Sequence, residues 1–268
     1  GTPFPMSDPA QPLVSFVIPM YFTGEGVERL FEAFRDLKLD GAYELVLVND
    51  GSTDDTVERV HRAMADYPVP VTFVELARNF GEHAAVLEGF RHARGRYVVN
   101  LDDDLQNPVH EAVRIVDKLR ESGADVVYTY YDEKKHHWFR NFGSWLTNEV
   151  ANFLLEKPRD LYLCSFRGMT YDLIQRIVAY RGPYPYVDGL ILGATNRIDR
   201  LLVAHNERSD GQSGYTLRKL LRLWMNMFFN FSVMPLRLAS VLGFALCALG
   251  AAMLPMTEHY GCGQDVLL

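Results

Sequence analysis

Residues 97–108, YVVNLDDDLQNP, place three adjacent carboxylates directly after a short apolar run. The run 97–101 predicts a buried strand, and acids at the carboxyl end of a strand are typical of ligand sites in open α/β sheets. Neighbouring carboxylates repel one another, and Mg²⁺ can compensate by binding carboxylate and substrate phosphate oxygens. The residues allow either a metal–diphosphate site or a solvated acidic turn that caps a helix beginning near Pro108.

The region before residue 131 alternates between two hydrophobic patterns. Short apolar runs predict strands at residues 13–20, 43–48, 71–76, 97–101 and 125–130. Amphipathic patterns predict helices at residues 27–37, from a cap at 49–55 to about 67, 82–93 and 109–119. This βαβα alternation predicts an α/β fold with a doubly wound, mostly parallel sheet.

Composition narrows the class of protein. With 268 residues and 48% hydrophobic content, the chain is long enough for one large α/β domain and an appendage. Its formal net charge of -7 and the lack of a basic stripe argue against nucleic acid as a partner. Cys164, Cys247 and Cys262 are widely spaced, which favours neither a zinc site nor a disulfide framework and fits a reducing cytosolic setting.

The C-terminal region has a membrane signature. Residues 217–231 mix basic with apolar and aromatic side chains, as an interfacial helix or an ordinary core-packing helix would. Residues 238–254 have no charged residue, which favours a single membrane span over a buried helix. Lys and Arg residues precede this span and none follows it, so the positive-inside rule predicts that the large domain lies in the cytoplasm. Apolar residues at 224–231 are also compatible with a homo-oligomer contact.

These signals divide the chain into a cytosolic domain at 13–215, an amphipathic interfacial helix at 216–235, a transmembrane helix at 236–254 and a polar tail at 255–268. Two further segments allow two interpretations each. The basic and aromatic residues at 134–140 fit a flap over the site or a solvated face. The loop at 208–215, RSDGQSGY, fits a diphosphate-binding loop or a surface turn.

Taken in order, the motifs resemble family 2 glycosyltransferases. The early motifs are VIPMY at 17–21, VNDGSTD at 48–54, RNFG at 78–81 and LDDDLQNP at 101–108. The later ones are SFR at 165–167, Arg208 followed by GQSGY at 211–215, and PLR at 235–237 before the predicted span. This later set is similar to the polyprenyl-phosphate glycosyltransferases within the family, and the likeness covers roughly residues 13–254.

The resemblance implies a GT-A fold in an enzyme of the cell inner membrane. The implied reaction transfers a sugar from a nucleotide diphosphate sugar, most commonly a UDP-sugar, to the phosphate of a membrane polyprenol such as undecaprenyl phosphate. The anomeric centre is inverted, and Mg²⁺ or Mn²⁺ is the implied cofactor.

The resemblance also implies a role for each matching residue. The implied catalytic residues are Asp102, Asp104 and Arg208. The implied nucleotide or donor contacts are Pro19, Tyr21, Glu25, Asp50, Asp102 and Asp103. The implied metal ligands are Asp102 and Asp104 with Gln106, and the implied acceptor or diphosphate contacts are Arg167, Arg208 and Ser213. If a general base is needed, Asp103 or Asp104 is the first candidate.

The chain departs from the family pattern at two motifs, and it has one predicted span where many bacterial members have two. The family often has an Asn-Glu-Glu run after its Pro-x-Tyr, where this chain has Phe22, Thr23 and Gly24 followed by Glu25, and a Lys where it has Gly214. These departures keep open a membrane-anchored nucleotide-sugar-binding scaffold with a degenerate transferase domain, and a glycosyltransferase with a non-lipid acceptor. A processive polysaccharide synthase should have a QxxRW element, which Arg222-Leu223-Trp224 does not match.

Overall fold

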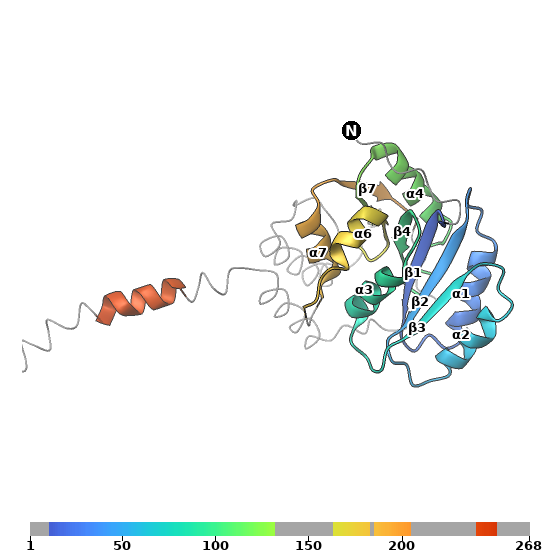
Figure 1. Cartoon of the computed structure of the whole chain (residues 1–268), viewed down its shortest axis with the longest axis horizontal. Coiled ribbons are helices and arrows are strands. Elements are labelled where there is room, and N and C mark those ends of the chain that lie inside the picture. Colours follow the sequence, from blue (N-terminus) through green and yellow to red (C-terminus); the bar gives the residue numbers. More distant parts are fainter. Residues whose placement is uncertain (1–10, 132–162, 183–184, 205–239, 251–268) are drawn as a thin grey trace, which may run out of the picture. The chain divides into compact units, whose positions relative to one another are not determined.

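The structure is a computed structural model that describes residues 11–131, 163–182, 185–204 and 240–250 (Figure 1). The predicted flap, the loop at 208–215, the interfacial helix and the polar tail lie outside these described residues.

Every strand and helix predicted before residue 131 is present, with small shifts at the ends. The strands are β1 (Val14–Met20), β2 (Tyr43–Asn49), β3 (Val71–Glu75), β4 (Tyr97–Asn100) and β5 (Val126–Tyr130). The helices are α1 (Gly26–Arg35), α2 (Thr56–Met64), α3 (Glu82–His92) and α4 (Glu111–Ser122). The elements β6 (Arg167–Thr170), α6 (Tyr171–Ile177), α7 (Val187–Ala194) and β7 (Ile198–Leu202) follow, and the sequence patterns did not predict them.

The strands form one seven-stranded sheet in the order β3-β2-β1-β4-β6-β5-β7. β1 pairs in parallel with β2 and β4, β2 pairs in parallel with β3, and β5 pairs in parallel with β7. β6 is antiparallel to both β4 and β5, with Arg167 opposite Asn100 and Tyr128. The prediction of a mostly parallel sheet is therefore confirmed, with β6 as the exception.

Helices cover both faces of the sheet (Figure 1). On one face, alternate β1 residues Val14, Phe16 and Ile18 share a buried cluster with apolar residues of α1 and α4. On the other face, Val17 shares a cluster with residues of α3, α6 and α7. Strand residues alternate between the faces, so a fully apolar strand such as β1 is buried on both sides.

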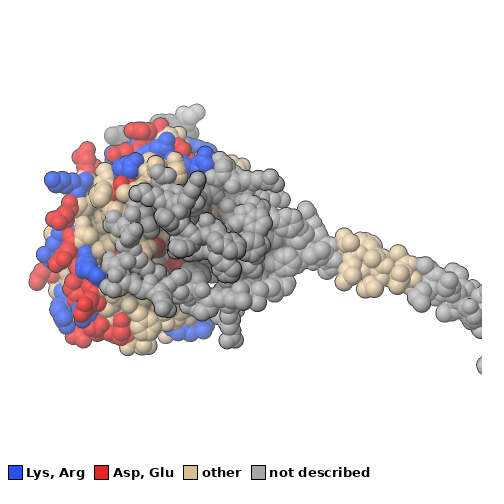
Figure 2. All heavy atoms as spheres, turned by 180° about the vertical axis from the view of Figure 1, so that it is seen from behind, with Lys and Arg blue, Asp and Glu red and all other residues tan. Residues whose placement is uncertain are grey.

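The second compact unit of the chain is described only at residues 240–250, which form a helix. Its side chains are exposed, and it carries neither acidic nor basic residues (Figure 2). None of the helices described here has the length and apolar character needed to cross a membrane. The predicted span at 236–254 lies only partly within the described residues.

Candidate active site

The candidate site residues collect at one edge of the sheet. Tyr21 follows β1, Asp50 follows β2 and Asp102 follows β4 shortly after its last residue. These strands are parallel, so their carboxyl ends meet at the same edge, where ligands bind in such sheets. Arg167 reaches that edge from the start of antiparallel β6.

Asp50 fixes the start of α3. Its two carboxylate oxygens accept the backbone N–H groups of Phe80 at 2.7 Å and Gly81 at 2.9 Å. Asp50 is 3% exposed, and burial raises the pKa of its carboxyl group. The next residue must be glycine, because Gly51 has a φ of 71° and a Cβ there would lie 2.5 Å from the backbone of Arg78. Asp50 therefore ties the β2–α2 turn to the RNFG segment.

The three carboxylates of the acidic turn, residues 102–107, have different partners. Asp102 accepts the Ser165 hydroxyl at 2.7 Å, Asp103 accepts the Thr23 hydroxyl, and Asp104 accepts the backbone N–H of Gln106 at 3.1 Å. Leu105 has a φ of 57°, which is uncommon for a residue other than glycine and shapes the turn. The capping interpretation is wrong, because α4 begins at Glu111 with His110 as a cap residue that makes no side-chain bond.

The donor set of the acidic turn suits a hard divalent cation. The pKa of Asp103 is raised to about 6, by burial first and also by the charges of Asp102 and Asp104. A cation would offset this concentration of negative charge, and carboxylate and amide oxygens are ligands that Mg²⁺ and Mn²⁺ accept. Within the described ranges, no three His, Cys, Asp or Glu side chains are grouped to hold a metal ion by themselves. At a metal bound here, the Gln106 amide oxygen and oxygens of substrate or water would complete the coordination.

Arg167 is buried beneath the site. Its guanidinium forms an ion pair with Asp188 of α7, and both residues are less than 10% exposed. The Tyr128 hydroxyl donates to the same Asp188 oxygen at 2.9 Å. We expected Arg167 to contact the acceptor, and that role stays a prediction. In the structure the ion pair joins β6 to α7, and the Tyr128 hydroxyl joins β5 to the same carboxylate.

The other predicted residues fall into three groups. Tyr21 and Glu25 are exposed in the loop between β1 and α1, while Pro19 is buried within β1. Gln106 is partly buried in the acidic turn. Arg208 and Ser213 lie outside the described residues.

Several residues around the site were assigned no role from the sequence. Ser165 and Thr23 bind the acidic turn, and Asp188 pairs with Arg167. Glu82 and His83 begin α3 immediately after the RNFG motif, and the His83 ring packs edge-on against Tyr186 at 4.9 Å. For Glu82 and His83, the position directly after the RNFG motif was the only sign of a role in the sequence. The contacts of these residues could not be predicted, because each partner comes from a distant part of the chain.

The pKa values of Glu82 and His83 are shifted in opposite directions. Glu82 reaches solvent, yet desolvation by the surrounding protein and the charge of Asp102 raise its pKa to about 7. Desolvation also lowers the pKa of His83 to about 4. Their unperturbed values are 4.5 and 6.5, so each group couples stability to pH with the opposite sign.

We predict that Glu82→Gln becomes more stable relative to the unchanged protein as the pH rises from 4.5 to 7. In that window the folded protein holds a proton on Glu82 that the unfolded chain has released, so Glu82 reduces stability as pH rises. His83→Gln should change in the opposite sense between pH 4 and 6.5, because His83 disfavours the folded state at the acidic end. Urea unfolding across these pH ranges measures both trends, and parallel curves for Glu82→Gln and the unchanged protein would contradict the assignment.

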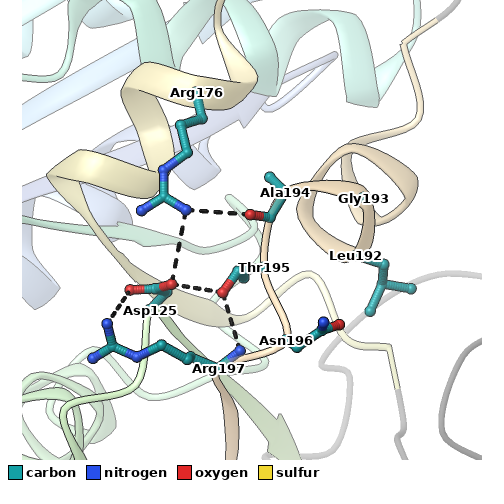
Figure 3. Close-up of a pocket in the computed structure, with 8 residues that line it drawn as sticks. All are labelled: Asp125, Arg176, Leu192, Gly193, Ala194, Thr195, Asn196 and Arg197. Carbon is teal, nitrogen blue, oxygen red and sulfur yellow. Dashed lines mark hydrogen bonds and ion pairs between the residues drawn. The ribbon is translucent and has the colours of Figure 1, made fainter.

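A separate hollow lies at the opposite edge of the sheet (Figure 3). Asp125 precedes β5 there and accepts the Thr195 hydroxyl at 2.6 Å, while Arg176 and Arg197 lie on either side of its carboxylate. Arg176 also donates to the Ala194 carbonyl at 3.2 Å. These contacts join the ends of α6 and α7 to β5, and the hollow is separate from the acidic turn.

The comparisons with known proteins identify the family. Residues 15–181, more than half of the chain, match the model of "Glycosyl transferase family 2". The chain belongs to glycosyltransferase family 2. Among its relatives in the family, the undecaprenyl-phosphate 4-deoxy-4-formamido-L-arabinose transferase of Pseudomonas syringae is 34% identical over 239 residues, which cover 88% of this chain and 71% of that protein. The protein of the same name from Edwardsiella ictaluri is 33% identical over 242 residues, covering 89% and 74%.

Solved structures of other proteins share this α/β fold. Glucosyl-3-phosphoglycerate synthase from Mycobacterium tuberculosis, in complex with Mn²⁺, UDP and glucosyl-3-phosphoglycerate, has a TM-score of 0.55 and 18% sequence identity. The match covers 81% of this chain and 77% of that chain. The described domain of this glycosyltransferase therefore has a GT-A-like α/β fold, as the sequence motifs implied.

Proposed function

We propose that this glycosyltransferase moves a sugar from a nucleotide diphosphate sugar to the phosphate of a membrane polyprenol, inverts the anomeric centre and requires a divalent metal. UDP is the proposed nucleotide and undecaprenyl phosphate the proposed acceptor. The observation that carries the proposal is the convergence of Asp50, Asp102 and Asp104 at the carboxyl edge of the sheet, together with the acceptor named in the relatives.

The proposed nucleotide subsite lies around Asp50. Asp50 accepts the N–H of Phe80, and its own N–H donates to Met20, the residue before Tyr21. Tyr21 and Phe80 are 49% and 52% exposed, and the Arg78 guanidinium lies 4.5 Å from the centroid of the Phe80 ring. A base and a ribose need this combination of stacking surface and hydrogen-bond acceptor.

The proposed diphosphate subsite lies at the acidic turn. Asp102, Asp104 and Gln106 would hold Mg²⁺ or Mn²⁺, which when bound supplies positive charge to the departing diphosphate. Arg208 and Ser213 are proposed to contact the diphosphate or the acceptor phosphate. Negative charge grows on the diphosphate as it leaves, so positive groups beside it stabilise the transition state more than the ground state. This difference is what accelerates the reaction.

The acceptor phosphate is already anionic near neutral pH. Unlike a sugar hydroxyl, it therefore needs positioning and charge screening more than it needs a strong general base. We accordingly assign no general base. Arg167 is proposed as an acceptor or diphosphate contact, with its buried ion pair to Asp188 holding the side chain in place.

The proposed organisation is a cytosolic catalytic domain at 13–215, an interfacial helix at 216–235, a transmembrane helix at 236–254 and a polar tail at 255–268. The uncharged stretch at 238–254 and the basic residues before it support attachment to the inner membrane with the catalytic domain in the cytoplasm. A homo-oligomer through the apolar residues at 224–231 is a further proposal.

The test is sugar transfer to undecaprenyl phosphate in detergent from a panel of UDP-, dTDP- and GDP-linked sugars. The panel includes UDP-linked 4-deoxy-4-formamido-L-arabinose because the relatives carry that sugar in their name. Each donor is tested with Mg²⁺, Mn²⁺ or EDTA, and we expect labelled lipid with metal and none with EDTA. Nucleotide-sugar binding without lipid product from any donor would favour the scaffold or a non-lipid acceptor.

A further inference from the structure

A hydrogen bond joins the β1–α1 loop, residues 21–25, to the acidic turn. The Thr23 hydroxyl donates to Oδ2 of Asp103, although the two residues are 80 positions apart in the sequence. Both side chains are partly buried. The bond therefore connects the proposed nucleotide side of the site directly to the segment that carries the proposed metal ligands.

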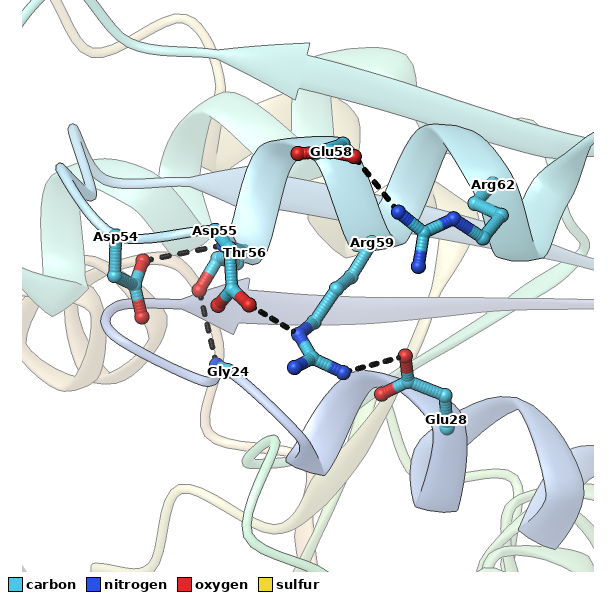
Figure 4. A network of polar contacts seen from close by, with 8 residues as sticks. All are labelled: Gly24, Glu28, Asp54, Asp55, Thr56, Glu58, Arg59 and Arg62. Carbon is cyan, nitrogen blue, oxygen red and sulfur yellow. Dashed lines mark hydrogen bonds and ion pairs between the residues drawn. The ribbon is translucent and has the colours of Figure 1, made fainter.

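The same loop is anchored on either side of Thr23. The Phe22 N–H donates to the Ser52 hydroxyl at 3.0 Å, and the Gly24 N–H donates to the Thr56 hydroxyl at 3.0 Å (Figure 4). Phe22 has a φ of 55°, a conformation that is rare for a bulky side chain and persists only when neighbouring contacts impose it. These contacts hold Thr23 between two fixed points.

Close packing at the start of α1 brings the loop and the turn together. A Cβ at Gly26 would lie 3.0 Å from Cγ2 of Thr23 and 4.0 Å from the backbone oxygen of Asp103. The absence of a side chain at Gly26 therefore lets Thr23 pack tightly beside α1 while it reaches Asp103.

With this bond, the three carboxylates of the turn are each held by a different segment of the chain. Asp102 is held by Ser165 from the segment before β6, and Asp104 is held within the turn by the backbone of Gln106. Asp103 is held by the β1–α1 loop. This division keeps the middle carboxylate on the loop side and reduces its competition with its neighbours for one cation.

We propose that Thr23 is a positioning residue, and that its bond to Asp103 fixes the acidic turn against the β1–α1 loop so that Asp102 and Asp104 serve the metal and the diphosphate. Asp103 then acts on the turn through its bond to Thr23. This inference rests on the proposed function, because it concerns how the metal–nucleotide site is held.

The test compares Thr23→Val, Asp103→Ala and the double variant with the unchanged protein. Calorimetry measures UDP binding with Mn²⁺, and transfer assays separate kcat from KM. Each single variant should weaken Mn²⁺-dependent UDP binding by about tenfold, and the double variant should be no weaker than either single variant. Thr23→Ser and Asp103→Asn retain the donor and the acceptor and should restore most of the binding. Thr72→Val, on β3, is the matched control and should bind like the unchanged protein.

The outcomes distinguish this inference from the proposed function. If the unchanged protein binds UDP with Mn²⁺ but Thr23→Val binds equally well, or if the two single effects add, the positioning role is overturned and the proposed function stands. If the unchanged protein binds no nucleotide with any metal, both the positioning role of Thr23 and the proposed function are overturned. Failure of Thr23→Ser and Asp103→Asn to restore binding would also overturn the role of the hydrogen bond.

Discussion

Replacing Asp104 with Asn is expected to slow sugar transfer by about 10²–10³-fold while the fold stays intact. The amide removes the charge that we assign to the metal and the diphosphate. It retains an oxygen that can accept the Gln106 N–H, the bond that shapes the turn. The measurement is the initial rate of lipid labelling at saturating metal, with urea unfolding to check stability.

Asp117→Asn is the matched control for this variant. Asp117 is a carboxylate of α4 whose side chain is 53% exposed and faces Arg120 at 3.7 Å. Losing this surface charge should leave the transfer rate unchanged. Near-normal transfer by Asp104→Asn would remove Asp104 from the proposed metal site.

Replacing Arg167 with Met is expected to lower the free energy of unfolding by about 3–5 kcal/mol, because it leaves the buried carboxylate of Asp188 without its cation. Small domains have total stabilities of about 5–15 kcal/mol, so this loss is large. Replacing both partners, Arg167→Met with Asp188→Leu, should recover much of it, since neither charge is then left buried alone. Urea unfolding at constant pH measures all three proteins.

Arg62→Met provides the comparison on the surface. Arg62 pairs with Glu58 at 2.7 Å on α2, but the two side chains are 67% and 74% exposed (Figure 4). Water screens such a pair, so its loss should cost only about 0–1 kcal/mol. Equal losses for Arg62→Met and Arg167→Met would show that the buried pair has no special structural role.

The sequence predicted much of the first half of the fold because its signals are local. The apolar runs that became β1 to β4 lie in order along the chain, and helical periodicity separates them. The acidic turn could be located for the same reason, since its carboxylates follow directly from an apolar strand. What could not be predicted was β6, which is short and whose insertion between β4 and β5 depends on pairing with distant strands.

The sequence by itself determined the alternating α/β architecture, the family motifs and the edge of the sheet where the candidate site residues collect. Only the tertiary structure decided which polar groups meet there: Thr23 with Asp103, Ser165 with Asp102, and Arg167 with Asp188. The physical reason is that strand and helix patterns repeat over a few residues, whereas each of these contacts joins segments brought together by sheet pairing and helix packing. Arg167 shows the difference most clearly, because nothing in the local sequence indicates that it pairs with a buried carboxylate of α7.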